Sequence, residues 1–143
     1  MKILWTDGSA NPNPGPGGFA VIEQRPRRKS RPVMIGSSKR TTNIQMEGWA
    51  IYTAIKYADG EECEIHTDSQ FWINVLTKWA PAWEAKDWKK SGDPIKNLAL
   101  VKRLYAIYSE NPVKLVWVKG HVGKRLNEMA DEWAKKAREG YKV

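Results

Sequence analysis

The spacing of apolar residues along the chain changes near Met46. Before this point they form short runs that predict three strands, at 2–6, 19–22 and 33–35. From Met46 to Ala58 they recur every three or four residues, which predicts an amphipathic helix that ends at Asp59 and Gly60. A strand over 64–67 and a helix over 69–76 follow directly. This strand, helix, strand, helix order implies a crossover connection, and therefore parallel pairing between strands.

The remainder of the chain continues the same alternation. A Pro/Gly-rich turn over 11–18 separates the first two strands. Pro94 precedes a helix whose predicted buried face contains Leu98, Val101, Leu104, Tyr105 and Tyr108. A fifth strand over 113–118 and a final helix over 126–137 complete the order. With no internal repeat or linker, residues 1–143 are predicted to form one α/β domain, with a mixed five-stranded sheet, an antiparallel meander plus parallel strands, flanked by helices.

Composition excludes several classes of protein. A chain of 143 residues fits one domain, and 41% hydrophobic residues with eight tryptophans exclude disorder. The single cysteine, Cys63, excludes an internal disulfide and a cysteine-based zinc cluster, and its place in a predicted strand favours a buried thiol. We find no signal-peptide pattern and no apolar run near the roughly 20 residues that span a bilayer. We expect a cytoplasmic protein with no membrane partner, and we take it to be a monomer.

The charge balance points weakly to a polyanionic partner. The formal net charge is +8 and the pI is near 9.6, which favours nucleic-acid binding over a merely solvated surface. A basic cluster over 25–31 has two interpretations, a solvated hairpin tip or a phosphate contact. Farther along, Trp79, Trp83 and Trp88 are interspersed with lysines.

Three acidic residues stand near the ends of predicted elements, and each also has a purely structural interpretation. Asp7, followed by Gly8, is able to cap a turn. Glu47 in the first turn of a helix complements the helix dipole. Asp68 lies where a strand passes into a helix, a place where α/β sheets expose functional groups, but it is equally suited to cap that helix.

A fourth acid, Asp131, lies in the middle of the last predicted helix, where a surface ion pair with Lys135 is the structural alternative. Four carboxylates so far apart in sequence are useful together mainly if they converge. Converging carboxylates repel one another and need cations between them, most naturally Mg²⁺ or Mn²⁺. Jointly, the acids point to metal-dependent phosphoryl transfer.

Seven short strings follow one another from about Ile3 to Ala137. They are Thr6-Asp7-Gly8-Ser9, Asn13-Pro14-Gly15-Pro16-Gly17-Gly18, Arg40-Thr41-Thr42-Asn43, Met46-Glu47, Thr67-Asp68-Ser69-Gln70, Trp117-Val118-Lys119-Gly120-His121, and Asn127-Glu128 with Asp131. Taken together, they resemble type 1 ribonuclease H, although no one string is specific alone. The resemblance is closest to bacterial enzymes with a basic, tryptophan-rich insertion, here Trp79–Lys90.

The resemblance implies a ribonuclease H fold and endonucleolytic cleavage of the RNA strand of RNA–DNA hybrids, leaving 5′-phosphate and 3′-hydroxyl ends. The metal-binding residues it implies are Asp7, Glu47, Asp68 and Asp131, holding two Mg²⁺ ions about 4 Å apart, with Mn²⁺ as a substitute. Asp7 would bridge both ions, Asp131 would serve the ion that activates water, and Glu47 and Asp68 would hold the other. His121 would transfer a proton or assist product release, with a glycine-flanked surface histidine as the alternative. His66 is interpreted as a packing residue.

The resemblance also implies substrate contacts. Minor-groove contacts are expected from Asn13, Asn43 and Gln70, a DNA phosphate pocket from Arg40, Thr42 and Asn97, and contacts along the DNA backbone from Lys86, Lys89 and Lys90. The tryptophans of the insertion are expected to pack more than to stack on bases. Ile44 and Gln45 depart from the polar or basic residues of many relatives, so minor-groove contacts there would be fewer.

Three alternatives stay open. One is a non-catalytic hybrid-binding module, which the four intact acids disfavour. Another is a nuclease of the same fold that acts on DNA, such as a resolvase or an integrase core, which would lack the His121 loop and the insertion. The last is a domain cut from a retroelement polyprotein, which Met1 directly before the first strand disfavours.

Overall fold

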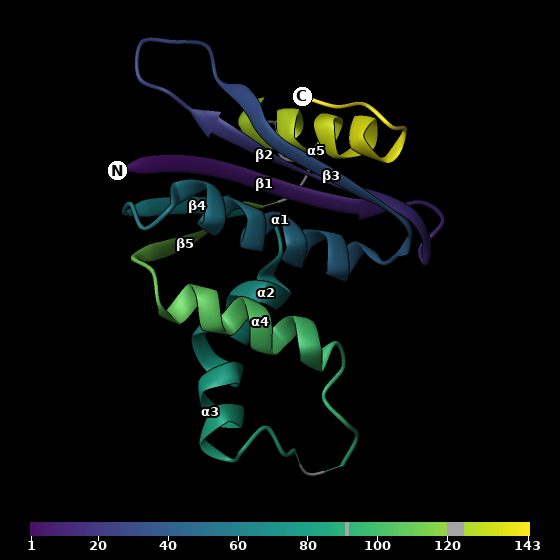
Figure 1. The fold of residues 1–143 in the computed structure, drawn as a ribbon, viewed down its shortest axis with the longest axis vertical. Helices are drawn as coiled ribbons and strands as arrows, with labels where there is room; N and C mark the ends of the chain where they lie inside the picture. Colours follow the sequence, from purple (N-terminus) through teal and green to yellow (C-terminus); the bar gives the residue numbers. More distant parts are fainter. Residues whose placement is uncertain (91, 120–124) are drawn as a thin grey trace.

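The computed structural model describes residues 1–90, 92–119 and 125–143. Within these residues, five strands form one mixed sheet in the order β3-β2-β1-β4-β5 (Figure 1). The strands are β1 (Lys2–Ala10), β2 (Gly15–Gln24), β3 (Arg31–Thr41), β4 (Cys63–Thr67) and β5 (Val113–Trp117). The first three pair antiparallel, and β1, β4 and β5 run parallel. The expected combination of an antiparallel meander with parallel strands is confirmed.

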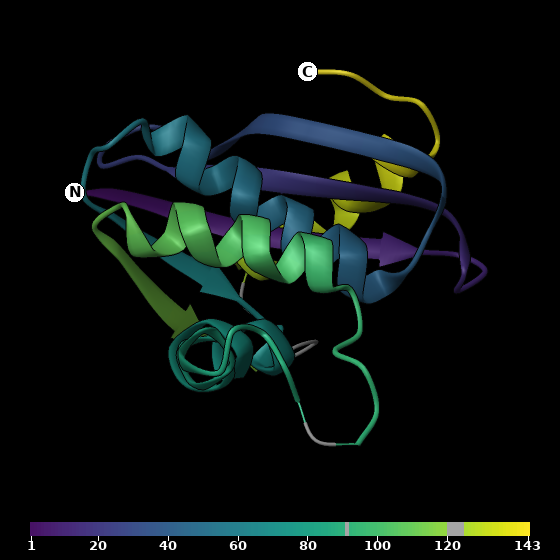
Figure 2. The same ribbon diagram turned by 60° about the horizontal axis from the view of Figure 1, so that its bottom comes forward.

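Helices cover both faces of the sheet. They are α1 (Asn43–Ala58), α2 (Gln70–Asn74), the π-helical turn η1 (Val75–Trp79), α3 (Ala80–Ala85), α4 (Leu98–Ser109) and α5 (Arg125–Arg138). In Figure 2, α1 and α4 lie on the near side of the sheet and α5 on the far side. The segment from α2 to α3 lies beside α4, away from β2 and β3 (Figure 1).

Each face of the sheet has its own core, because successive residues of a strand point to opposite faces. Leu4 of β1 belongs to the large cluster under α1 and α4, together with Ile51 and Leu104, all fully buried. Its neighbour Trp5 belongs to a smaller cluster with Ala130 of α5. Asp7 follows Trp5 by two residues, so its side chain is directed to the α5 face.

Several boundaries differ from the sequence-based expectations. β1 continues to Ala10, because its ladder with β2 runs on to the Ala10–Gly17 pair. The glycines of the expected turn over 11–18 therefore start β2 at Gly15, since ladder hydrogen bonds outweigh the low strand preference of glycine. α1 begins at Asn43 rather than Met46 because Thr42 caps it, accepting a hydrogen bond from the Gln45 backbone amide.

These boundaries overturn two of the structural alternatives. Asp7 lies inside a strand, so it does not cap a turn. Glu47 lies in the second turn of α1, and the first turn contains no acidic residue, so the dipole explanation for Glu47 is wrong. Cys63 is buried as expected.

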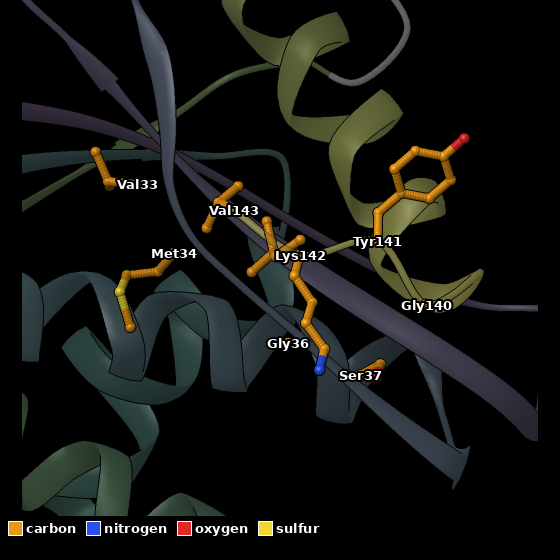
Figure 3. A pocket seen from close by; sticks show the side chains of 9 residues that line it. Val33, Met34, Gly36, Ser37, Gly140, Tyr141, Lys142 and Val143 are labelled. Atoms are coloured by element: carbon orange, nitrogen blue, oxygen red, sulfur yellow. The ribbon is translucent and has the colours of Figure 1, made fainter.

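The C-terminal residues Gly140–Val143 lie beside the edge strand β3 (Figure 3). Together with residues 33–37 they line a pocket of about 510 Å³ that contains none of the expected site residues. Within the described parts of the chain, no helix is long and apolar enough to cross a membrane.

Candidate active site

Asp7 and Asp68 stand at matching positions of two neighbouring parallel strands. β1 and β4 pair in register, with Trp5 opposite His66, and Asp7 and Asp68 each follow these partners by two residues. Because the two strands run parallel in this register, Asp68 is brought alongside Asp7 just where β4 ends at Thr67.

Glu47 reaches the same place from α1 because the helix lies very close to β1 at Gly8. A Cβ atom added to Gly8 would lie 2.3 Å from the Met46 carbonyl carbon and 2.4 Å from the Glu47 amide nitrogen. Only a residue without a side chain allows the two backbones to approach this closely. The glycine after Asp7 thus serves to bring Glu47 to the strand.

The start of α2 is held against α1 by Trp72, which is fully buried. Its indole Nε1 donates a 2.7 Å hydrogen bond to the Ile44 carbonyl oxygen, and its ring packs where Gly48 leaves room. Ser69 caps α2, accepting from the Trp72 amide at 3.3 Å. The cap is therefore Ser69 and not Asp68, so the capping explanation for Asp68 is wrong.

These three elements bring Asp7, Glu47 and Asp68 together. One carboxylate oxygen from each lies within 4.8 Å of the others, an arrangement able to hold a metal ion. Carboxylate oxygens are the ligands that Mg²⁺ and Mn²⁺ prefer. The donor set therefore fits a hard divalent cation.

The cluster is electrostatically unfavourable without a cation. Burial raises the pKa of Asp7 well above its usual value, and the charges of Asp68 and Asp131 raise it further, while a hydrogen bond with the Gly8 backbone opposes the shift. Burial also raises the pKa of Glu47 to about 7, with a contribution from Asp68 and an opposing hydrogen bond from the Ser69 side chain. Burial and mutual repulsion therefore make it costly to ionise Asp7 and Glu47 beside Asp68 without a cation.

Asp131 lies near this cluster without belonging to its closest group. It is near enough to raise the pKa of Asp7, but it is absent from the group whose oxygens lie within 4.8 Å. Its Oδ2 forms an ion pair with Lys135 Nζ at 3.1 Å. Both interpretations of Asp131 therefore have a structural basis.

Asn13 and Asn43 join the β1–β2 turn to the start of α1. The Asn13 Oδ1 accepts from the Asn43 backbone amide at 3.1 Å, and the Asn43 Oδ1 accepts from the Ala10 amide at 2.7 Å. The structure thus brings two of the three expected minor-groove residues together. Gln70 is exposed at the first position of α2.

Two residues of the expected phosphate pocket, Thr42 and Asn97, are linked through Gln45. Its Nε2 donates to Asn97 Oδ1 at 3.0 Å, its backbone amide donates to the Thr42 hydroxyl, and its Oε1 accepts from the Thr41 hydroxyl at 2.9 Å. Arg40 is exposed one residue before Thr41. From the sequence, Gln45 is noticeable only as a departure from the polar or basic residues of many relatives, because no local pattern reveals a partner 52 positions away.

The basic insertion is anchored by its tryptophans. Trp83 and Trp88 pack against the large core cluster, and the Trp88 ring contacts Tyr105 of α4 at 6.1 Å between centroids. Trp79 is 41% exposed and lies at 6.2 Å from Trp83. Packing is confirmed for Trp83 and Trp88, and the insertion presents Lys86, Lys89 and Lys90 as exposed side chains.

The two histidines differ in what the structure describes. His66 stacks on Trp5 with ring centroids 4.1 Å apart, and its Nε2 lies 2.6 Å from Glu64 Oε1, in agreement with a packing role. His121 lies outside the described residues.

A mixed α/β sheet of this order, with a carboxylate cluster beside its central parallel strands, is an arrangement typical of metal-dependent nucleases. The chain belongs to the ribonuclease H family, whose family model matches residues 1–139.

Individual relatives agree with this assignment. The chain is 38% identical over 138 residues to Ribonuclease H of Granulibacter bethesdensis, covering 94% of this chain and 90% of that protein. It is 37% identical over 133 residues to Ribonuclease H of Methylorubrum extorquens, covering 92% of this chain and 58% of that longer relative. Among solved structures it is similar to LC9-RNase H1, described as a type 1 RNase H with the type 2 active-site motif, with a TM-score of 0.76, 25% identity, and 98% and 74% of the two chains covered.

Proposed function

We propose that this ribonuclease H hydrolyses the RNA strand of RNA–DNA hybrids, cutting internally and leaving 5′-phosphate and 3′-hydroxyl ends. The observation that carries this proposal is the convergence of Asp7, Glu47 and Asp68 within 4.8 Å in a chain of the ribonuclease H family. The whole-protein activity is inferred from relatives named Ribonuclease H.

Asp7, Glu47 and Asp68 would hold divalent cations, with Asp131 as a fourth carboxylate beside Asp7. The raised pKa values of Asp7 and Glu47 support this role, because burial and mutual repulsion both disfavour their negative charges unless a cation is bound. Bound Mg²⁺ ions would activate a water molecule and stabilise the leaving 3′ oxygen. Mn²⁺ takes the same oxygen ligands and would substitute.

Residues around the acids would keep them in place. The Ser69 side chain forms a hydrogen bond with Glu47 and also caps α2. It therefore links α1, which carries Glu47, to the start of α2, directly after Asp68. The Gly8 backbone forms a hydrogen bond with the Asp7 carboxylate. His121 would transfer a proton or assist product release, as the family resemblance implies.

Substrate recognition would use three groups of residues. Asn13, Asn43 and Gln70 would contact the minor groove, where the 2′-hydroxyl distinguishes RNA from DNA. Arg40, Thr42 and Asn97 would hold a DNA phosphate, and Gln45 would help to position Thr42 and Asn97. Lys86, Lys89 and Lys90 would follow the DNA backbone. We also propose that the protein acts as a cytoplasmic monomer.

The test is an incubation with Mg²⁺ and labelled RNA–DNA hybrid, RNA duplex, DNA duplex and single-stranded RNA. Only the RNA of the hybrid should be cut, and a chelator should stop the reaction. Asp68→Asn should lower the rate by more than about 100-fold, since it removes a metal ligand. Asp59→Asn is the matched control, because Asp59 is exposed at the far end of α1, and it should leave the rate unchanged. Cutting of duplex DNA would instead indicate a DNA-directed nuclease, and binding of hybrid without cutting a non-catalytic module.

A further inference from the structure

The connection between β2 and β3 forms a basic hollow with the first turns of α5. The hollow has a volume of about 680 Å³ and is lined by five cationic side chains, Arg25, Arg27, Arg28, Lys29 and Arg125. None of the described residues that line it is acidic. We call it the hairpin hollow. Among these described lining residues, none is assigned above to metal or substrate.

Contacts within the β2–β3 connection hold the hairpin hollow in shape. The Arg25 guanidinium donates two hydrogen bonds to the Lys29 carbonyl oxygen, from Nε at 3.2 Å and from Nη2 at 2.9 Å. Between them Arg27 adopts a left-handed backbone conformation, with φ of 61°, which is unfavourable for a residue with a side chain. The turn is therefore closed on itself, and its exposed side chains Arg27, Arg28 and Lys29 line the hollow.

The positive charges of the hairpin hollow have no acidic partner in the part of the chain that the structure describes. There, no ion pair joins Arg25, Arg27, Arg28, Lys29 or Arg125 to a carboxylate. Like charges gathered in a concavity repel one another and focus a positive potential. Leu126 and Met129 give the hollow an apolar floor against which arginine stems can rest. Such a site is matched by an anion, and guanidinium groups suit phosphate oxygens best.

α5 connects the hairpin hollow to the acidic cluster. Arg125 and Asp131 are six residues apart on this helix, which corresponds to about 9 Å along its axis. Successive phosphates of a nucleic-acid strand advance by about 3.4 Å along the helix axis. Measured along the helix axis alone, this separation equals the rise of roughly two to three nucleotides.

We propose that the hairpin hollow binds backbone phosphates of the hybrid on one side of the cleavage site. This inference rests on the proposed function, because it takes the hybrid to be the ligand of the acidic cluster. The hollow extends the bound surface in a direction separate from the Lys86, Lys89 and Lys90 insertion, since it lies on α5 and the β2–β3 connection rather than beside α3.

The test compares two charge-matched triple variants. One combines Arg27→Gln, Arg28→Gln and Lys29→Gln, leaving the Arg25 hydrogen bonds intact. The other combines Lys56→Gln, Lys102→Gln and Lys114→Gln, all exposed, on α1, α4 and β5. Both are made in Asp68→Asn protein, so that binding is measured without cutting. Hybrid affinity is followed by fluorescence anisotropy over a range of salt concentrations, and thermal melting confirms that the variants fold.

The hairpin variant should lower the salt slope of binding by about 2 to 3 and weaken affinity by about tenfold or more. The control variant should change the salt slope and the affinity by less than the hairpin variant does. With hybrids lengthened one base pair at a time on either side of the cleavage site, the parent should gain affinity on the side of the hollow, and the hairpin variant should lose that gain while keeping any gain on the other side. Equal slopes for the two triple variants, or a length profile unchanged by the hairpin variant, would overturn the proposal.

Cleavage by the same triple variants with Asp68 restored separates the two proposals. The hairpin variant should keep its maximal single-turnover rate while needing more hybrid to reach half of it. If the unsubstituted protein cuts no hybrid, the proposed function fails, whereas the binding comparison still reports on the hollow. If it cuts hybrid and the hairpin variant matches the control in both binding and half-saturation, only the hollow is disproved.

Discussion

Asp7 in β1 and Asp68 beyond the end of β4 lie side by side because the two strands pair in parallel register, and their carboxylate oxygens come within 4.8 Å of each other. Asp7 is only 6% exposed. Two acids this close in a buried setting raise each other's cost of ionisation. The fold therefore holds them together against their repulsion, and a bound cation would relieve it.

The raised pKa of Glu47, caused first by burial and then by the charge of Asp68, predicts that stability without metal falls as pH rises. The pKa of Glu47 is about 7 in the folded protein, above its ordinary value of 4.5, so the folded state holds a proton that the unfolded chain releases at lower pH. The contribution of Glu47 to stability is therefore largest below about pH 4.5 and is lost as the pH rises through about 7. The loss from this group should be of the order of 1–3 kcal/mol.

Thermal melting in a chelator between pH 5 and pH 8 checks this expectation. Glu47→Gln should show a shallower decrease than the unsubstituted protein, because the titrating group is gone. Added Mg²⁺ should raise the melting temperature of the unsubstituted protein at pH 8 and have less effect on Glu47→Gln. Parallel melting curves for the two proteins would contradict the assignment of Glu47 to the cluster.

The role of Asp131 is decided by comparing the two partners of its ion pair. If Asp131 is a metal-binding residue, Asp131→Asn should lower hybrid cleavage by at least about tenfold, and raised Mn²⁺ or Mg²⁺ should restore part of it. Lys135→Ala removes only the 3.1 Å surface pair and should cost about 0.3–0.5 kcal/mol of stability with little loss of rate. Equal effects of the two substitutions on cleavage would show that the ion pair, not the carboxylate, matters.

Gly8→Ala should damage both stability and activity. The new methyl group would meet the backbone of Met46 and Glu47 at 2.3–2.4 Å, so α1 must move away from β1 and carry Glu47 with it. We expect a loss of about 2–4 kcal/mol in unfolding free energy and a large loss of cleavage. Ser9→Ala in the next position is the control, since it removes only a 3.4 Å hydrogen bond from Arg138 and should cost less than about 1 kcal/mol. Urea unfolding of both variants measures the loss of stability, and the hybrid cleavage assay measures the loss of activity.

Neutralising Lys86, Lys89 and Lys90 together should weaken hybrid binding and flatten its salt dependence by about one unit of slope for each lost phosphate contact. These side chains are exposed, so the melting temperature should hardly change. Trp88→Ala tests whether packing positions them, because Trp88 anchors the turn against Tyr105. An unchanged salt slope in the triple variant would place the insertion away from the nucleic-acid backbone.

Local patterns in the sequence predicted much of this architecture. The apolar stripe from Met46 to Ala58 gave the correct helix end, and the short runs located the five strands of the sheet. These patterns are readable because solvent exposure alternates with the period of each element. Asp68 was placed correctly between a strand and a helix for the same reason.

Other features depend on contacts between distant segments. Ser69 rather than Asp68 caps α2, Gln45 reaches Asn97 across 52 positions, and the basic residues of the β2–β3 connection form a hollow only because α5 begins beside them. Which acids are close enough to share a cation was likewise set by the pairing of β1 with β4 and by the close approach of α1 at Gly8. Periodicity along a chain encodes which face of an element is buried, whereas register and the spacing between backbones arise only when those faces pack together.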